Sequence, residues 1–527
     1  MSGSEHIVLV GLPGTGKSTV APLLAARLGR PCRDTDADVE ARLGLTVPRV
    51  FTELGEARFR AEERVSLDRA LGSGEPLVIA AGGGLVAQPG VVDLLGRRAT
   101  VVLLEAADGE IVDRLRGTSA GRPLLAPEPG VALHHLRGHR RSAHAHAQLR
   151  VATGGRTPDE VAGSIAAALA GAIRVGTQVP YLVRVGAGVL DAVPDHVPAT
   201  ARRVAVICDE AVRAVADRIA ARVRAAGVDS TVIDIPGGER AKEWLSAGRL
   251  LEECSQSRLE RGDCVVAVGG GSIGDVAGMV AALYLRGIAW VVVPTTLLAM
   301  VDSAVGGKTA VNLHRGKNLA GVFWQPRAVV CDPDLLATLP DRNLRSAFAE
   351  VVKCSMIGSP ELQGLVDARL DAALARDVTA LSEIISGCCT LKAGVVAADE
   401  RETGLRAILN YGHTVGHAVE TLTAGGLGLD HGEAVAFGMR VAGALSVNQS
   451  GCPAGDITRQ DTLLDSCGLV QRPELSAEAV AAQLGGDKKA HGGVAHWVLL
   501  RGRGQPVAGI VVPPGEVDVA LREALAA

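Results

Sequence analysis

A glycine-rich loop near the N-terminus has the residue types needed to hold a chain of phosphates. Residues 11–18 read Gly-Leu-Pro-Gly-Thr-Gly-Lys-Ser, directly after an apolar run at 7–10 and before a helical pattern. Glycines let backbone N–H groups converge on phosphate oxygens, the lysine ammonium reaches the outer phosphates, and the serine hydroxyl coordinates Mg²⁺. We therefore predict a site for ATP with Mg²⁺, in which the metal lies on Ser18 and the nucleotide contacts Gly14, Thr15, Gly16, Lys17, Ser18 and Thr19.

Downstream segments carry polar residues that suit a small phosphoryl acceptor. They are Asp34-Thr35-Asp36, Phe59-Arg60, Gly82-Gly83-Gly84 after the apolar run 77–79, and Arg122-Pro123-Leu124-Leu125. With the glycine loop, these motifs resemble shikimate kinase over about residues 5–174. Transfer of a γ-phosphoryl group requires mainly positioning and neutralisation of charge, which such residues provide.

The resemblance to shikimate kinase implies a role for each of these positions. Asp36 would bind the acceptor hydroxyls, Arg60 would pair with the shikimate carboxylate, and Gly83 would allow close backbone approach. Arg122 would lie on a lid over ATP, and Asp34 would place Mg²⁺ through water. The implied catalytic residues of this half are Lys17, Asp36 and Arg122.

One element of the kinase pattern is missing. The late Arg-x-Pro-Leu-Tyr element is absent, and the local sequence is Arg140-Arg141-Ser142-Ala143-His144. We expect Arg141 to provide the second carboxylate contact, with Arg140 as the alternative. The histidines at 134, 135, 139, 144 and 146 are interpreted as a solvated helix, because no carboxylate or cysteine accompanies them. The missing element also leaves a second hypothesis, a non-catalytic nucleotide-binding regulatory module.

A second glycine-rich turn, 269–275, follows the apolar run 264–268 and opens another helical pattern. Such turns hold pyrophosphates, but this one does not have the usual dinucleotide spacing, so it is weak evidence alone. One further polar motif, at 237–242, precedes this turn. Others follow it at 294–296, 302–308, 316–318 and 349–353.

Histidines near residue 420 have the spacing of metal ligands. His413 and His417 are four residues apart and share one face of a predicted helix, and His431 follows in His-Gly-Glu. Glu350, His413 and His431 make a plausible set of two histidines and one carboxylate, which leaves a position on zinc open to substrate.

From about Val179 to the end, the motifs resemble 3-dehydroquinate synthase over nearly its full length. The resemblance implies Zn²⁺ (or Co²⁺) on Glu350, His413 and His431. It implies NAD⁺ bound by Glu239, Lys242, Gly271, Asp275, Thr295, Thr296, Lys308, Lys317 and Thr338. It implies a substrate pocket of Arg286, Asp302, Lys308, Asn318, Lys353, Lys392, Arg406, Asn410, His417 and Lys488 or Lys489, with Lys353, Asn410 and His417 as the catalytic residues.

The implied reaction converts 3-deoxy-D-arabino-heptulosonate 7-phosphate to 3-dehydroquinate and phosphate. NAD⁺ would oxidise an alcohol transiently, phosphate would leave, and the ring would reclose as a carbocycle, with zinc as a Lewis acid. Two alternatives share this fold, a related sugar-phosphate cyclase and a glycerol dehydrogenase. Lys353, Arg406 and the Lys488-Lys489 pair favour an acidic phosphorylated substrate over glycerol.

The composition agrees with small-molecule chemistry. The 527 residues are 47% hydrophobic and 21% charged with a net charge of −4, unlike a disordered or nucleic-acid-binding chain. The longest run without a charge, 76–92, contains four glycines, so no membrane span is predicted. The 10 scattered cysteines argue against a disulfide framework. We expect a cytoplasmic enzyme with small-molecule substrates, no nucleic-acid or membrane partner, and a homodimer formed through the synthase half.

The elements that must position these residues form three units of an α/β protein. Apolar runs alternate with helical patterns, which predicts parallel sheets. We expect a P-loop kinase domain at 1–174 with a closing helix at 158–173, a Rossmann-like α/β NAD domain at 179–339, and a mostly α-helical metal- and substrate-binding part at 340–527. The strands expected in the middle unit are 181–185, 204–208, 231–235, 264–268, 290–293 and 328–331.

Overall fold

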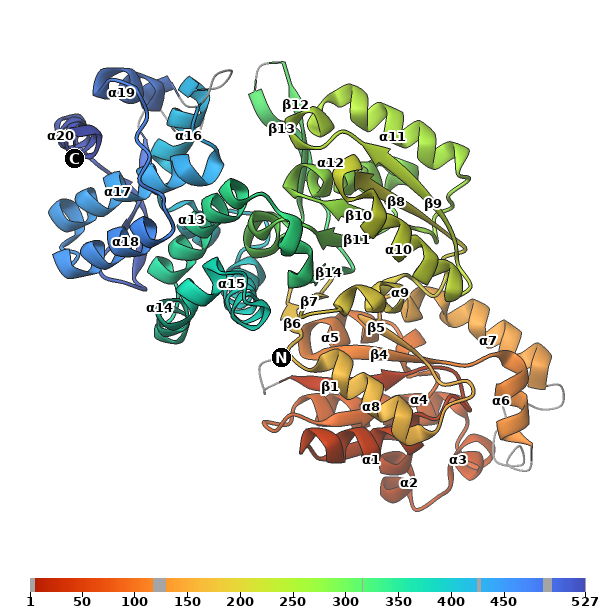
Figure 1. Ribbon diagram of the computed structural model, residues 1–527. Helices are drawn as coiled ribbons and strands as arrows, with labels where there is room; N and C mark the ends of the chain where they lie inside the picture. Colours follow the sequence, from red (N-terminus) through yellow and green to blue (C-terminus); the bar gives the residue numbers. More distant parts are fainter. Residues whose placement is uncertain (1–4, 117–128, 315, 424–427, 487–494, 527) are drawn as a thin grey trace.

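The computed structural model describes residues 5–116, 129–314, 316–423, 428–486 and 495–526. The predicted site residues Arg122, Lys488 and Lys489 therefore lie outside the described residues. Two parallel sheets and a helical unit follow one another along the chain, as Figure 1 shows, so the predicted α/β fold class is confirmed.

The N-terminal unit is built on a parallel sheet with the order β2-β3-β1-β4-β5. Helices α1 and α8 pack on one face, and α4, α5 and the end of α7 cover the other, around cores of Val, Leu, Ile and Ala. The strands are β1 (His6–Val10), β2 (Cys32–Asp34), β3 (Val78–Ala80), β4 (Ala99–Glu105) and β5 (Leu149–Ala152). The helices are α1 (Lys17–Leu28), α2 (Thr35–Leu43), α3 (Val47–Glu53), α4 (Glu56–Leu71), η1 (Leu85–Ala87), α5 (Val91–Arg98), α6 (Asp108–Leu115), α7 (Pro129–His144) and α8 (Pro158–Leu169).

The closing helix α8 ends earlier than the predicted 158–173. It stops at Leu169. Gly171 then has a φ of +67°, a value that glycine adopts more easily than other residues. Residues 173–175 then form β6, which pairs antiparallel with β7 of the second sheet. We therefore propose that the junction between the first two units lies near residue 172.

The second sheet has the order β6-β7-β14-β11-β10-β8-β9 and is parallel except for β6. All six strands expected here are present. Its strands are β6 (Ile173–Val175), β7 (Tyr181–Val185), β8 (Arg203–Asp209), β9 (Asp229–Ile235), β10 (Cys264–Gly269), β11 (Ala289–Pro294) and β14 (Ala328–Cys331), with the hairpin β12 (Lys308–Leu313) and β13 (Gly316–Phe323). Its helices are η4 (Val189–Ala192), α9 (Val193–His196), η5 (Glu210–Val212), α10 (Arg213–Ala225), η6 (Gly238–Lys242), α11 (Trp244–Gln256), α12 (Gly271–Leu283), η7 (Tyr284–Arg286), the π-helical η8 (Ala299–Ser303) and η9 (Pro333–Thr338).

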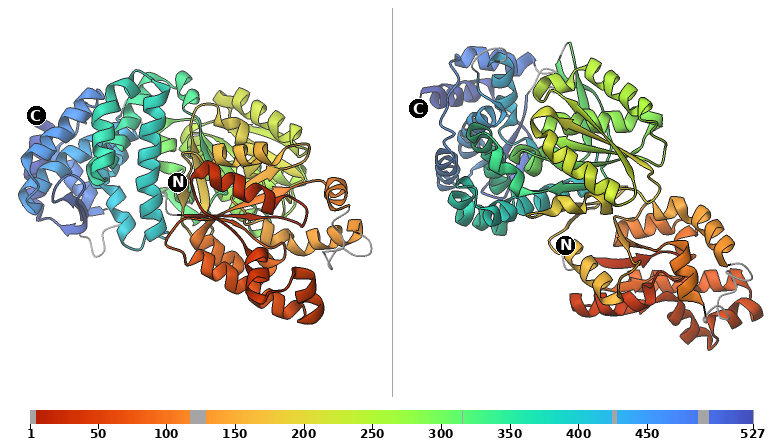
Figure 2. Two further views of the ribbon diagram at one scale, coloured as in Figure 1. Left: turned by 90° about the horizontal axis from the view of Figure 1, so that it is seen from below. Right: turned by 45° about the vertical axis from the view of Figure 1, so that its right-hand side comes forward.

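The C-terminal unit is mostly helical and shares one hydrophobic core with the second sheet. Its elements are α13 (Asp341–Ile357), α14 (Pro360–Leu374), α15 (Val378–Ala398), η10 (Leu405–Asn410), α16 (His413–Thr423), α17 (His431–Ser450), α18 (Ala454–Ser466), α19 (Ala477–Gly486), β15 (His496–Leu500), β16 (Pro506–Val511) and α20 (Pro514–Ala526). In both views of Figure 2 this unit lies beside the second sheet.

One described helix, α15, is long and apolar enough to cross a membrane by length and composition alone, contrary to the expectation of no such segment. More than half of its most apolar window, 56%, is buried inside the protein. Its buried residues belong to the common core of the second and third units. This burial is typical of a core helix, because a membrane-spanning helix turns much of its surface to lipid.

Candidate active sites

A cavity of about 680 Å³ joins the glycine loop after β1 to the residues expected to bind the acceptor. All the predicted nucleotide contacts from Gly14 to Thr19 line it, and so do Asp36 on α2, Arg60 on α4 and Gly83 after β3. These positions come from segments up to 70 residues apart because parallel strands end at the same edge of the sheet. One cavity thus contains a phosphate loop and an acceptor pocket.

The glycine loop has the backbone geometry of an anion site. Gly14 and Gly16 have φ values of +83° and +93°, which glycine alone adopts without strain. Helix α1 begins at Lys17, so its free N–H groups face the loop. Lys17 Nζ donates hydrogen bonds to the carbonyl oxygens of Gly11, at 3.0 Å, and Leu12, at 3.1 Å. The ammonium therefore lies over the loop, where outer phosphates would bind.

Arg60 in the acceptor pocket is held by two glutamates of its own helix. Its guanidinium lies 2.7 Å from Glu63 Oε2 and 3.0 Å from Glu56 Oε1. Glu63 is fully buried, and burial raises its pKa to about 7 despite the attraction of Arg60. The sequence analysis missed Glu63, although its position three residues after Arg60 on a predicted helix was an available signal.

The glycines after β3 leave room for the pocket arginines. A Cβ atom at Gly84 would lie 2.5 Å from Cζ of Arg60, and one at Gly83 would lie 3.2 Å from Nη1 of Arg140. A real Cβ contact is essentially never as short as the one at Gly84, so a side chain at Gly84 would displace Arg60. The predicted close approach at Gly83 thus brings the backbone next to a cation.

Arg140, the alternative of the two neighbouring arginines, lines the cavity. Its side chain is 3% exposed, and among the described residues Nη1 has no hydrogen-bond partner. Burial lowers its pKa to about 10, so it remains charged at neutral pH. The side chain of Arg141, the favoured candidate, lies outside the described residues. Arg140 lies in the cavity, and Arg141 as the second carboxylate contact stays a prediction.

Two other expectations for this unit need comment. His144 is buried, with its pKa lowered to about 4 by burial, so the solvated-helix interpretation is wrong for this one histidine, which packs against the sheet. None of the metal-binding groups found in the described part of the chain includes the histidines of α7. Asp34 caps α2, because its Oδ1 accepts the N–H of Asp36 at 3.0 Å.

The second glycine-rich turn connects β10 to the N-terminus of α12 and lies among the predicted NAD⁺ contacts. Lys242, 5% exposed, pairs with Asp275 Oδ2 at 2.6 Å and also contacts Asn318 Oδ1. Glu239 accepts a hydrogen bond from Asn312 of the hairpin at 2.7 Å. A Cβ at Gly271 would lie 2.7 Å from Ser303 Oγ, so a larger residue there would displace the serine side chain.

The remaining predicted cofactor contacts differ in position. Thr295 and Thr296 directly follow β11, and Lys308 of β12 pairs with Glu402 at 2.6 Å. Thr338 and Arg286 are exposed, and no hydrogen bond or ion pair in the described part of the chain links either one to the other predicted ligands. Glu239, Lys242 and Asp275 thus lie around the turn and hairpin, whereas Thr338 as a cofactor contact and Arg286 as a substrate contact stay predictions.

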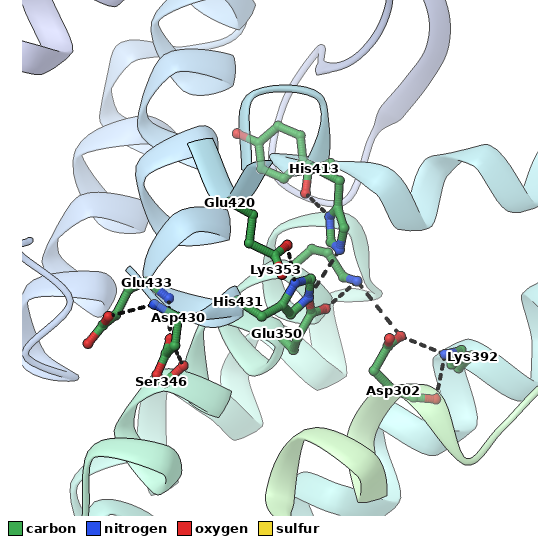
Figure 3. A network of polar contacts seen from close by, with 11 residues as sticks. Asp302, Ser346, Glu350, Lys353, Lys392, His413, Glu420, Asp430, His431 and Glu433 are labelled. Carbon is green, nitrogen blue, oxygen red and sulfur yellow. Dashed lines mark hydrogen bonds and ion pairs between the residues drawn. The ribbon is translucent and has the colours of Figure 1, made fainter. Parts of the chain in front are cut away.

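A network of charged side chains joins three of the predicted substrate contacts, Asp302, Lys353 and Lys392 (Figure 3). Lys392 Nζ lies 2.5 Å and Lys353 Nζ 3.9 Å from Asp302 Oδ1. Lys353 also pairs with Glu350, and these two carboxylates outweigh burial and raise the pKa of Lys353. The Lys353 ammonium therefore remains charged in the interior, as recognition of an anionic substrate requires.

Other predicted substrate contacts lie near this network. Arg406 is 2% exposed, and its guanidinium donates to the carbonyls of Glu400, at 2.8 Å, and Gly306, at 3.2 Å. Asn410 and His417 line a second cavity of about 230 Å³ together with His413.

Glu350, His413 and His431 meet as the histidine spacing predicted. His413 Nε2 is 3.2 Å and His431 Nε2 3.5 Å from Glu350 Oε1, and one ligand atom of each lies within 4.8 Å of the others. Glu350 is fully buried on α13, and the histidines begin α16 and α17. The other nitrogen of His413 contacts Tyr411 O at 3.1 Å, which turns Nε2 toward the carboxylate. Two imidazoles and a carboxylate, oriented in this way, fit zinc.

Glu420, which the sequence analysis missed, contacts this set from behind. Its Oε2 lies 3.2 Å from His431 Nδ1, and its Oε1 lies 3.1 Å from Lys317 Nζ of the hairpin. His431 and Lys317 lower the pKa of Glu420 to about 2. Glu420 lies seven residues after His413 on one helix, so the spacing offered a weak signal. It connects a metal ligand to a predicted cofactor contact.

The fold and the two sites define a two-site enzyme, a P-loop phosphotransferase unit followed by an α/β metalloenzyme unit. Family models agree with this division: "Shikimate kinase" matches residues 13–170, "3-dehydroquinate synthase N-terminal" matches 232–346 and "3-dehydroquinate synthase C-terminal" matches 347–490. The 3-dehydroquinate synthase of Caulobacter vibrioides is 44% identical over 334 residues, which are 62% of this chain and 90% of that protein. The chain belongs to the 3-dehydroquinate synthase family, fused behind a shikimate kinase unit.

Solved structures support the metalloenzyme half. A 2-deoxy-scyllo-inosose synthase bound to carbaglucose-6-phosphate, NAD⁺ and Co²⁺ is 29% identical, with a TM-score of 0.62, and covers 67% of this chain and 99% of its own. The 2-epi-5-epi-valiolone synthase of Streptomyces hygroscopicus, with NAD⁺ and Zn²⁺ bound, is 27% identical, with a TM-score of 0.60, and covers 65% of this chain and 96% of its own.

Proposed function

We propose that the N-terminal unit transfers the γ-phosphoryl group of ATP to shikimate, which yields 3-phosphoshikimate. The observation that supports this most directly is the single cavity that contains both the glycine loop and the acceptor residues. Lys17 and the loop N–H groups bind the phosphates, and Ser18 holds Mg²⁺. Asp36 orients the acceptor hydroxyl, while Arg60 and Arg140 bind the carboxylate. Arg122 remains the candidate for the lid contact.

The remaining two thirds convert 3-deoxy-D-arabino-heptulosonate 7-phosphate to 3-dehydroquinate and phosphate. The adjacency of the Glu350, His413 and His431 set to the network of Asp302, Lys353 and Lys392 supports this assignment. Bound NAD⁺ and Zn²⁺ or Co²⁺ supply hydride transfer and a Lewis acid for the substrate oxygens.

The chain's own residues then bind and orient the substrate. Lys353 and Lys392 neutralise its negative groups in a buried setting, where each charge interaction is stronger than in water. Asn410 and His417 donate or accept hydrogen bonds at the mouth of the second cavity. The turn after β10 binds the cofactor pyrophosphate, with Lys242, Asp275, Thr295 and Lys317 around it. Arg286, Thr338, Lys488 and Lys489 remain candidate contacts.

The kinase assignment is tested by shikimate-dependent production of ADP. We expect the full chain to form ADP only when shikimate is present, and we expect Lys17→Ala to abolish this formation. The family match does not favour the regulatory-module hypothesis; an inactive wild-type kinase would restore it.

The synthase assignment is tested by phosphate release from two substrates. We expect release from the seven-carbon acid phosphate and none from sedoheptulose 7-phosphate, because the latter has no carboxylate for the buried cations. Release from sedoheptulose 7-phosphate alone would identify a different sugar-phosphate cyclase. Relatives that are 42–46% identical are 3-dehydroquinate synthases, which favours our assignment.

A homodimer through the synthase half and a cytoplasmic location remain predictions. Light scattering with size-exclusion chromatography measures the mass directly. A mass of twice the 54.1 kDa chain is the expected result.

A further inference from the structure

The junction between the kinase unit and the second sheet contains an arginine that reaches across it. Arg327 directly precedes β14, and its backbone N–H bonds to Trp290 O of β11 at 2.8 Å. Its side chain leaves this sheet and donates to two carbonyls of the kinase unit, those of Ala145 and of Ala147, the latter at 2.7 Å. Arg327 Nε also donates to His196 O at 3.2 Å. One guanidinium thus links the two halves through three backbone carbonyls.

The charge of Arg327 is directed at the kinase helix rather than at a carboxylate. Within the described ranges, no acidic side chain forms an ion pair with it. Burial lowers its pKa to about 10, so the group remains a cation at neutral pH. Its two kinase acceptors directly follow the C-terminal end of α7 at His144. A helix C-terminus carries partial negative charge, which a cation stabilises.

A second hydrogen bond holds the same turn. The ring of His196, 1% exposed at the end of α9, contacts Gln148 O through Nδ1 at 3.1 Å. Burial lowers the pKa of His196 to about 3, so the neutral ring must donate from Nδ1 to this carbonyl. Arg327 and His196 of the second unit therefore hold three carbonyls, those of residues 145, 147 and 148, in the turn between α7 and β5.

The anchored helix carries the acceptor-binding arginine. Arg140 is on α7, five residues before Ala145. Its buried guanidinium faces Gly83 in the kinase cavity. We propose that Arg327 of the synthase half is a positioning residue for Arg140, so that shikimate binding by the kinase depends on a side chain of its fusion partner. This inference rests on the proposed kinase activity.

The test uses the full-length enzyme loaded with metal and NAD⁺. Arg327→Met should raise the KM for shikimate about fivefold while the KM for ATP and the synthase activity change less than about twofold, because misplaced binding groups weaken only the contacts they make. Arg327→Lys, which keeps a cation able to reach a carbonyl, should restore most of the affinity for shikimate. If Arg327→Met does not fold, Arg327→Gln, which is shorter and uncharged, is the test variant and should also raise the KM for shikimate.

Two controls separate positioning from general loosening of the junction. Arg174→Met removes another arginine that reaches from the second sheet into the kinase unit, to Gly96 O and Glu5, but not to α7. It should leave the KM for shikimate unchanged. In an Arg140→Met background, Arg327→Met should have no further effect, because coupled residues are not additive.

The possible results separate a failure of the proposed kinase activity from a failure of the positioning role of Arg327. If the wild-type enzyme phosphorylates no shikimate, the proposed function fails. If it is active but Arg327→Met leaves the KM for shikimate unchanged, the positioning role is refuted. Equal rises in the KM values for shikimate and ATP, an equal effect of Arg174→Met, or independent effects of the Arg140 and Arg327 substitutions would also overturn it.

Discussion

Carboxylates that support cations or metal ligands distinguish both sites at the level of single residues. Glu63 holds Arg60 in the kinase cavity, and Glu420 contacts His431 behind the metal set. Neither carboxylate is expected to touch a reacting atom. Each one fixes the orientation of a group that does, which is how supporting residues tune binding and metal affinity.

The pKa of Glu63 predicts a pH dependence of shikimate binding. Since burial raises this pKa to about 7, the carboxyl is neutral below that pH and charged above it. The charged form makes the stronger hydrogen bond to Arg60. We expect the KM for shikimate to fall as the pH rises from 6 to 8, and Glu63→Gln to remove this dependence. Steady-state kinetics across this pH range measure the KM for shikimate, with the KM for ATP as the control. A wild-type KM for shikimate that does not change with pH would contradict this role of Glu63.

The same raised pKa has a consequence for stability. The pKa of the folded state lies above the unfolded value near 4.5, so the folded state binds the proton more tightly. The contribution of Glu63 to the free energy of unfolding therefore decreases as the pH rises from about 4.5 to about 7. In Glu63→Gln this part of the pH dependence should be absent. Denaturant unfolding of both proteins at several pH values measures it.

Glu420 predicts a change in metal affinity. Carboxylates that accept a hydrogen bond from a ligand histidine fix its orientation, and their loss typically weakens metal binding about tenfold to a hundredfold. Glu420→Gln should therefore release zinc to a competing chelator at a lower chelator concentration. The control is Glu383→Gln on α15, which removes a carboxylate paired with Arg369 of α14. This variant should bind zinc as the wild type does. Equal zinc retention by both variants would argue against this role.

Close packing of α16 against α17 brings the metal ligands together at the level of the elements. A Cβ at Gly438 would lie 2.9 Å from Gly416 N, and one at Gly416 would lie 3.2 Å from Val435 Cα. His413 and His431 begin these two helices. The glycines therefore set the helix separation on which the ligand geometry depends.

Gly438→Ala should separate the two helices and weaken the metal site. Overpacking of this kind costs about 1–3 kcal/mol, so we expect a lower Tm together with weaker zinc retention. Gly364→Ala on α14 is a matched control, because a Cβ there has nothing within 4 Å. This control should keep its zinc and gain slightly in stability, since alanine favours helix more than glycine does. Unchanged zinc retention in Gly438→Ala would contradict the argument.

The whole molecule contains two chemically separate sites on either side of a junction that Arg327 and His196 cross. The kinase cavity lies at the edge of the first sheet, and the metal set lies between helices of the third unit (Figures 1 and 3). Mg²⁺ on phosphates is held weakly, whereas a set of two histidines and a carboxylate binds zinc tightly.

A chelator should therefore affect the two activities differently. After EDTA treatment and removal of EDTA, we expect the kinase to recover fully with Mg²⁺ alone and the synthase to require Zn²⁺ or Co²⁺. Assays of both activities on one sample provide the comparison. A synthase that recovers with Mg²⁺ alone would refute the proposed metal set.

The sequence by itself determined the two families, the α/β fold class and the residues within contiguous motifs. The glycine loop, the strand at 181–185 and the pair His413 and His417 were readable because their chemistry depends on neighbours a few residues away. Helix α8 was misjudged only at its end, where pairing with a distant strand made residues 173–175 extended.

Tertiary structure alone decided which side chains act together across long distances in the chain. It brought Arg140 into the lining of the kinase cavity and placed Glu420 beside His431. It also brought Arg327 to the end of a helix that lies about 180 residues earlier. The physical reason is that such contacts depend on how sheets and helices pack, and no local pattern of residues specifies the packing of segments that are distant in the sequence.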